Sequence, residues 1–376
     1  MMKIFPCILV FVFVACSSHD TPILNTATYV GESPIVDDTL LFRDPKVFPL
    51  ETTENSLISY IDRIVEFNGD YYILDKRMKK VFAFDGSGNF QFAIHAVGGG
   101  LGEYVNVMDI AVDCRDSLLV LLSYPSELLY YDLKGSFVKN HKLSKKHYHA
   151  LTIDNEFIYL AQSTYVNKQI QSNSLTVVSR KTNEEEELLQ PLKEIAPYCF
   201  PRGYFLSMGL EPFFTRKFDD AVYRLDGASL LTDYTVDWGT STFQVEKELY
   251  SCRELQALCG EKHWVYSMFN FQESARQLCF STNLSNFYVL SKAKGTVTCY
   301  PKIRNIGYGV NLANYIPVSG DEPRLFFVFP AASLLQLRQL AAESTPAKKL
   351  LSPSMLEIVK DLKEDSNPIV FSYVLR

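Results

Sequence analysis

IDRIVEFNGDYYILDKRMKKVFAFDGSGNFQFAIH, residues Ile61–His95, contains four short apolar stretches that are separated by turn-forming residues. The pair Asn68-Gly69 favours a tight hairpin turn, and the run Gly86–Asn89 has a second composition of this kind. Short apolar stretches that end at such turns are typical of β-strands joined as hairpins. The segment therefore predicts one antiparallel sheet of four strands.

The next segment, Met108–Leu143, repeats the same order of strands and turns. KKVFAFDGSGNFQFAI in the first segment corresponds to ELLYYDLKGSFVKNHKL in the second: an apolar strand, an Asp, a turn with Gly, a Phe and a further strand. We expect Asp85 and Asp132 to accept hydrogen bonds from their own turns. Four strands joined by hairpins within about 35–45 residues are the repeating unit, or blade, of a β-propeller.

Later segments carry weaker versions of this pattern. They are His149–Gln162 with Ser174–Lys193, Pro212–Trp238, Ser267–Pro301 and a sixth unit that begins at Tyr308–Ala332. The sequence therefore predicts an all-β fold: a single six-bladed β-propeller of four-stranded antiparallel blades over residues 36–376. Apolar residues at helical spacing also predict short helical insertions. These lie at Phe243–Leu258, Ala331–Ala342 and Ser354–Leu362.

A propeller must close its ring of sheets, commonly by pairing a strand from one terminus with the sheet formed by the other. The C-terminal segment Ile369–Leu375 is the expected final strand. We expect either Ala27–Val30 or Leu40–Phe42 to pair beside it. On this view, the two ends of the chain hold the ring together.

The first residues have the pattern of an export signal: Lys3 precedes an apolar run that is too short to span a bilayer. Phe13–Cys16 is similar to the bacterial lipoprotein box, in which the Cys receives the lipid. We therefore expect a signal peptide over residues 1–15, lipidation at Cys16 and a flexible leader over residues 16–35. The alternative is an ordinary signal peptide that is cut just before Cys16 and leaves a plain thiol.

Composition limits the classes of partner and cofactor. The chain has 37 basic and 43 acidic residues, a net charge of -6 at pH 7, so it lacks the basic balance typical of nucleic-acid binding. An apolar content of 47% indicates a folded protein rather than a disordered one. No spacing of cysteines and histidines resembles a zinc site, and we expect no metal and no other cofactor.

Six further cysteines follow Cys16 and leave the disulfide pattern open. In an oxidising compartment they could pair, in up to fifteen ways if all six take part. The alternative is that most are small buried residues. These cysteines are Cys114, Cys199, Cys252, Cys259, Cys279 and Cys299.

Four motifs in the first two segments carry a family resemblance. They are Asn68–Asp75, Val81–Asp85 with Gly88, Gly100–Tyr104 and Asp109–Asp113. These motifs resemble those of the six-bladed β-propeller lipoproteins of Bacteroidota, relatives of NHL-repeat propellers, and the terminal Asn367–Val370 is similar to the usual end of that family. The resemblance implies a propeller fold and a lipid-anchored location in the cell envelope, with the outer membrane expected, but no settled activity.

A propeller of this kind offers a central funnel as its expected site. Arg63 and Asp109 lie on the expected inner strands, which makes them candidates for the funnel mouth; the alternative is that both are satisfied structural polar groups. We expect a non-enzymatic binding or scaffold module for a glycan, a peptide or an envelope protein. An alternative is a polysaccharide lyase or hydrolase, although no catalytic residue is evident from the residue spacing. Perturbed acids and a histidine that converge in the funnel would favour the enzyme.

Overall fold

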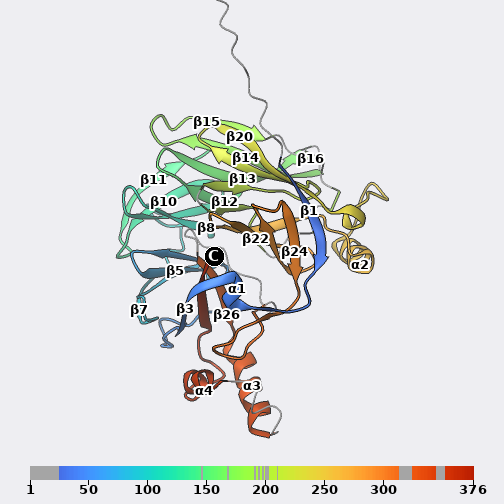
Figure 1. The fold of residues 1–376 in the computed structure, drawn as a ribbon. Helices are drawn as coiled ribbons and strands as arrows, with labels where there is room; N and C mark the ends of the chain where they lie inside the picture. Colours follow the sequence, from blue (N-terminus) through green and yellow to red (C-terminus); the bar gives the residue numbers. More distant parts are fainter. Residues whose placement is uncertain are drawn as a thin grey trace, which may run out of the picture.

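The computed structural model describes residues 25–144, 147–166, 169–189, 192–193, 195–196, 199, 203–209, 211–312, 324–343 and 352–376. These residues form a β-propeller-like, all-β fold in which antiparallel sheets follow one another around an axis (Figure 1). Three of its helices lie at its periphery: α2 Cys252–Lys262, α3 Ala331–Glu343 and α4 Pro353–Val359. The expected signal peptide and Cys16 lie outside the described residues.

The first two sheets are those that the sequence predicts most clearly. Their strand orders are β4-β5-β6-β7 and β8-β9-β10-β11. In the first sheet the strands are β4 Arg63–Phe67, β5 Asp70–Asp75, β6 Lys80–Phe84 and β7 Phe90–Ile94. In the second they are β8 Asn106–Asp113, β9 Leu118–Tyr124, β10 Glu127–Asp132 and β11 Phe137–Lys142.

The turns of these sheets form as expected. Asp85 accepts hydrogen bonds from the backbone N–H groups of Ser87 and Asn89, both at 2.9 Å. The Asp132 carboxylate accepts in the same way from Lys134 at 2.9 Å and Ser136 at 2.8 Å. Both predictions are confirmed, because a short acceptor side chain can satisfy the amides that a tight turn leaves unpaired.

The next three sheets have more irregular strands. The third contains β12 His147–Ile153, β13 Phe157–Val166, β14 Gln169–Ser179 and β15 Glu185–Leu189, with β16 Leu192–Lys193 paired to β14. The fourth contains β17 Leu206–Met208, β18 Pro212–Phe214, β19 Ala221–Asp226 and β20 Ser229–Asp237. The fifth contains β21 Met268–Glu273, β22 Gln277–Thr282, β23 Phe287–Ser291 and β24 Thr296–Tyr300.

The segment expected to be a flexible leader is partly built into the fold. β1, Asn25–Glu32, lies between β20 and β24 and pairs with both in parallel, so that the fourth and fifth sheets join at their outer edges (Figure 1). This corrects the expected leader boundary at residue 35. The physical reason is that β1 satisfies the exposed backbone groups of two edge strands at once.

The last sheet is closed by the N-terminal part of the chain. β27, Ile369–Leu375, is the central strand, and β26, Arg324–Phe329, and β3, Phe42–Pro49, pair antiparallel on its two sides. Of the expected segment Leu40–Phe42, only Phe42 pairs beside β27, as the first residue of β3, while Leu40 and Leu41 are helical. Ala27–Val30 takes the different position described above. Between β1 and β3 lie the short strand β2, Val36–Asp37, which pairs with β25, Ile303–Arg304, and the single-turn helix α1, Asp38–Leu41.

Two of the three expected helical insertions lie close to their predicted positions: α3 is Ala331–Glu343 and α4 is Pro353–Val359. In the third, α2 spans only Cys252–Lys262, so the helix expected from Phe243 begins later. The reason is the capping box of Ser251 and Glu254, which satisfies the first free N–H groups of the helix at that point.

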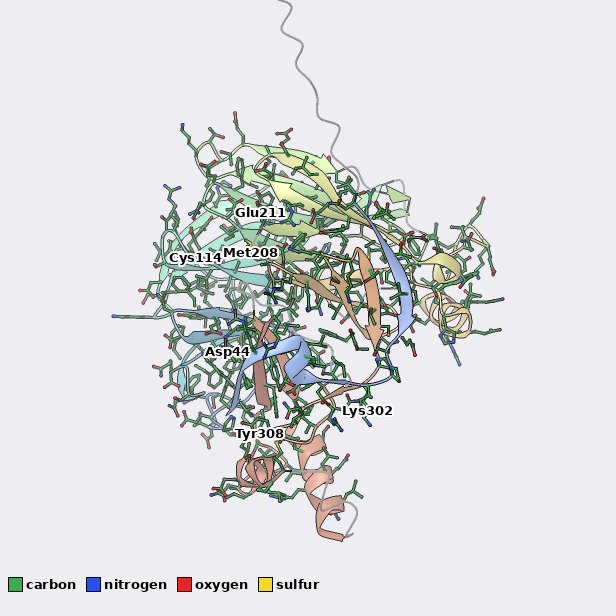
Figure 2. All side chains as sticks on the ribbon, viewed as in Figure 1. Asp44, Cys114, Met208, Glu211, Lys302 and Tyr308 are labelled. Atoms are coloured by element: carbon green, nitrogen blue, oxygen red, sulfur yellow. The ribbon has the colours of Figure 1, made fainter. Side chains whose placement is uncertain are left out.

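Apolar clusters fill the spaces between neighbouring sheets, in sequence order around the axis. A further cluster packs the closing sheet against the first one: Phe48 of β3 stacks on Tyr71 of β5, with ring centroids 4.5 Å apart. Near α4, Tyr308 packs edge-on against Phe371 of β27 (Figure 2). The hydrophobic core is therefore distributed as layers between the sheets.

Candidate functional site

Charged side chains from the first strands of two sheets meet near the axis of the molecule, beside a backbone N–H group from the first strand of a third. Arg63 of β4 and Asp109 of β8 form an ion pair, with Nη1 and Oδ2 2.9 Å apart, and both side chains are 0% exposed. Asp109 also accepts hydrogen bonds from the N–H groups of Ile110 at 2.9 Å and Leu151 of β12 at 2.8 Å. One carboxylate thus connects the first three sheets.

The structure brings the two predicted site residues together but leaves neither at a solvent-exposed mouth. Both side chains are buried and paired with each other, an arrangement expected of structural polar groups rather than of a funnel mouth. Burial raises the pKa of Asp109, although Arg63 and Lys76 both act in the opposite direction. Removing either partner of a buried ion pair leaves an uncompensated charge and destabilises the fold. We therefore assign Arg63 and Asp109 a structural role in holding the surrounding residues in place.

Tyr204 and Lys76 lie beside the ion pair. We call these two residues, together with Arg63, Asp109 and His149, the axial cluster. The Arg63 guanidinium carbon lies 4.8 Å from the centroid of the Tyr204 ring, and Lys76 Nζ lies 4.9 Å from it. Burial lowers the pKa of Lys76 and raises that of Tyr204. Sequence reasoning missed both residues because they lie in connections between strands, where the repeat pattern places no constraint.

His149, on β12, is a member of the axial cluster with a strongly lowered pKa. Burial lowers its pKa to about 4, and the nearby positive charges of Lys76 and Lys217 act in the same direction. The imidazole is therefore neutral at pH 7 and could accept a proton only at considerable cost.

This pKa predicts an acid-sensitive fold. An unfolded histidine titrates near pH 6.5, so the stability that His149 contributes is present above that pH and is lost as the pH falls toward about 4. We expect the loss to be roughly 2–3 kcal/mol. Urea unfolding at pH 7 and pH 4.5 should show a smaller acid loss for His149→Gln than for the wild type. The exposed His147 is the matched control, and an unchanged acid loss in His149→Gln would contradict the assignment.

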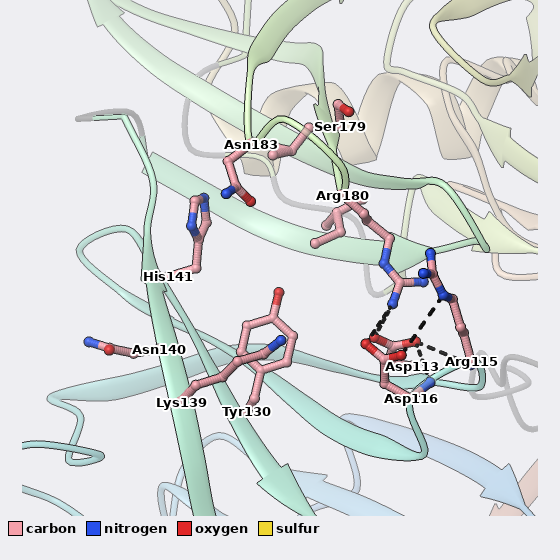
Figure 3. Close-up of a pocket in the computed structure, with 12 residues that line it drawn as sticks. Asp113, Arg115, Asp116, Tyr130, Lys139, Asn140, His141, Ser179, Arg180 and Asn183 are labelled. Carbon is pink, nitrogen blue, oxygen red and sulfur yellow. Dashed lines mark hydrogen bonds and ion pairs between the residues drawn. The ribbon is translucent and has the colours of Figure 1, made fainter.

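A cavity of about 250 Å³ lies between the second and third sheets, away from the axial cluster (Figure 3). Its lining comes mainly from the β8–β9 turn, β11, and the end of β14 with the turn that follows it. One side is held by Arg180, which is 10% exposed, pairs with Asp113, lies 3.3 Å from Asp116 and donates to the carbonyl of Asp154 at 2.8 Å. This guanidinium therefore fixes the wall of the cavity.

The opposite side of the cavity carries side chains that could form hydrogen bonds with a ligand. His141 Nε2 is buried and has no hydrogen-bond partner among the described residues. Burial raises the pKa of Tyr130 to about 12, so its hydroxyl stays a donor. Figure 3 shows this hydroxyl and the Asn183 amide directed toward the space beside His141. Lys139 Nζ lies 4.7 Å from the centroid of the Tyr130 ring.

The arrangement suits a small polar molecule more than a metal ion. No group of three or more His, Cys, Asp or Glu side chains is placed to hold a metal within the described part of the chain. The cavity volume is below the about 300–1,000 Å³ of sites for drug-sized ligands. Its size and mixed donors and acceptors therefore fit a single polar ring.

Comparison with solved structures places the fold among bacterial proteins. A predicted exported protein from Bacteroides fragilis matches with a TM-score of 0.72 and 15% identity, over 93% of this chain and 99% of that one. A member of the DUF4221 family from Bacteroides vulgatus matches with a TM-score of 0.50 and 12% identity, over 89% and 97% of the two chains. At these identities the likeness concerns the fold.

No curated protein matches the sequence. Among the residues that the structure describes, none of the helices has the length and apolar character needed to cross a membrane. A family model described as a domain of unknown function, DUF4934, matches residues 23–373. Because this match covers nearly the whole chain, the protein belongs to the DUF4934 family.

Proposed function

We propose that this chain is a six-bladed β-propeller displayed outside the cytoplasm on a lipid attached to Cys16. The blade count is supported by the apolar clusters that join the five successive sheets, the closing sheet and the first sheet again. The signal pattern of residues 1–15 and the similarity to a predicted exported protein support the location. The lipid would hold the propeller at the cell envelope, with the outer membrane as the expected site.

The propeller acts as a binding module for a glycan, and one sugar unit occupies the cavity between the second and third blades. The observation that carries this proposal is the buried Nε2 of His141, which has no hydrogen-bond partner in the described part of the chain and lies next to the Tyr130 hydroxyl and the Asn183 amide. Sugar hydroxyls both donate and accept hydrogen bonds, so they can satisfy all three groups. Lys139 and Arg115 add positive charge, which favours a sugar that carries a carboxylate.

Variants of the cavity test this proposal. A panel of soluble neutral and uronate-containing oligosaccharides is measured by isothermal titration calorimetry against the wild type, His141→Ala and Tyr130→Phe. Loss of one hydrogen bond should raise the dissociation constant by about 3–10-fold in each variant. His147→Ala, which lies on β12 outside the cavity lining, is the matched control and should bind normally.

Binding that is unaffected by both cavity variants would contradict the site. No glycan retention, together with a peptide or an envelope protein that co-purifies with the tethered chain, would replace the glycan by one of the other expected partner classes. The His147→Ala control lies outside the cavity, so a loss of binding in that variant would indicate a general effect on the fold rather than on the site.

A second candidate, a polysaccharide lyase or hydrolase, is favoured by one observation. The axial cluster combines a neutral His149 with Tyr204, Lys76 and an acid of raised pKa, which is the kind of convergence expected of acid–base catalysis. The same oligosaccharides, incubated with wild type and analysed by mass spectrometry, distinguish the two functions. Cleaved products that disappear in His149→Gln would support the enzyme, while intact ligands would support binding.

A further inference from the structure

Two cysteines that are far apart in the sequence lie sulfur to sulfur beneath α2. Cys199 is 1% exposed, Cys252 is the first residue of α2, and their Sγ atoms are 2.6 Å apart. Non-bonded heavy atoms normally rest about 3.5–4.0 Å apart, whereas a disulfide bond measures about 2.05 Å. The distance therefore lies much closer to a covalent bond than to a packing contact.

The backbone on both sides holds this pair in place. Tyr250 donates its N–H to the carbonyl of Ile195 at 2.7 Å, and the Ser251 capping box fixes the start of α2 one residue before Cys252. On the other side, Lys217 Nζ donates to the carbonyl of Cys199 at 3.1 Å. These hydrogen bonds help to hold the two cysteines beside each other.

The side chains around the two sulfurs are mostly apolar. Ala196, Leu255 and Tyr266 form a buried cluster around the two sulfurs. The Tyr266 hydroxyl is 3.4 Å from Cys199 Sγ. Apart from the Lys217 ammonium, these side chains offer little to stabilise a charged thiolate, so a neutral cross-link suits the pocket.

We propose that Cys199 and Cys252 form a disulfide that fastens α2 to the segment before the fourth sheet. In forming it, the two thiols lose two protons and two electrons. The oxidant is a second disulfide, carried by an envelope thiol oxidase or by oxidised glutathione, and it leaves as two thiols. Cys252, the more exposed sulfur, first forms a mixed disulfide with the oxidant, and Cys199 then displaces the oxidant by attacking the Cys252 sulfur.

Once formed, the bond should persist in the folded protein. Burial and the neighbouring Cys199 raise the pKa of the Cys252 thiol to about 11. A thiol of high pKa is both a poor nucleophile at neutral pH and a poor leaving group, so exchange in the folded protein is slow in each direction. An exported chain meets the oxidising conditions that such a bond requires.

The test uses the full chain, exported and purified from the envelope without a reductant. Iodoacetamide alkylation of the denatured protein, followed by mass spectrometry, should label two more cysteines after reduction than before it. An unreduced digest should contain one peptide pair that links Cys199 to Cys252. Reduction should also lower the melting temperature by about 5–10 °C, because the bond closes a long loop of the unfolded chain.

Variants separate this bond from the other possible pairings. Cys252→Ser should have no reducible bond and should melt at the temperature of the reduced wild type. Cys114→Ser is the matched control, since Cys114 is exposed and lies on the side of the molecule away from α2 (Figure 2), and it should keep the bond. Equal labelling before and after reduction, or a linked peptide that contains Cys259 instead, would overturn the proposal.

Discussion

Deletion of residues 369–376 should abolish the cooperative thermal transition of the entire chain. All seven residues of β27 are buried, and this strand is the central one of the closing sheet, between β26 and β3. Without β27, the N-terminal strand β3 loses its partner and the first sheet loses an apolar neighbour. Differential scanning calorimetry and near-UV circular dichroism should show an aggregation-prone protein with no sharp melt.

A single substitution tests the same closure in a chain of full length. Phe371→Ala removes a fully buried ring of β27 that packs against Phe329 and Tyr308, and we expect it to lower the free energy of unfolding by about 3–5 kcal/mol. Leu356→Ala on α4, at a side chain that is 39% exposed, is the control and should cost well under half as much. A truncated chain that keeps the wild-type melting temperature would show that the ring does not depend on this strand.

Replacement of Asp109 by alanine should have the second large effect, a loss of about 3–5 kcal/mol in the free energy of unfolding. The variant removes the carboxylate that compensates the buried Arg63 guanidinium, and it leaves the N–H groups of Ile110 and Leu151 without their acceptor. The measurement is urea denaturation at pH 7, followed by the intrinsic fluorescence of the tryptophans.

The control for this experiment is the double variant Arg63→Met with Asp109→Leu. An apolar pair of similar size removes both charges together, so it should recover a large part of the stability that Asp109→Ala loses. A loss in the double variant equal to the sum of the losses of Arg63→Met and Asp109→Leu measured singly would show that the pair is not energetically coupled. That result would remove the argument that the axial cluster rests on this ion pair.

The sequence predicts the first two sheets well because their information is local. Asn68-Gly69 and the turns at Asp85 and Asp132 define where strands end, and the alternation of turns and apolar stretches needs no knowledge of distant residues. The later sheets have weaker turns and longer strands, such as β14 with its register shifts. The sequence therefore predicts that these later sheets form, but it predicts the ends of their strands less accurately.

The candidate sites were predictable only in part. Arg63 and Asp109 occupy equivalent positions on inner strands, which is why the repeat pattern selects them, yet the pattern does not reveal that they face each other. Tyr204, Lys76 and the cavity around His141 depend on which sheets become neighbours. Residues in the connections between strands do not follow the strand periodicity, so the spacing of residues in the sequence could not have identified them.

By itself, the sequence determines an all-β chain of hairpin-linked strands, because turn chemistry and strand periodicity act over a few residues; the export signal stays a prediction. The tertiary structure decides the position of β1 between two outer strands, the closure of the last sheet by β3, and the meeting of Cys199 with Cys252. Each of these contacts joins segments that are far apart along the chain. They depend on how edges and apolar faces are satisfied once all the sheets are in place, which no local stretch of residues encodes.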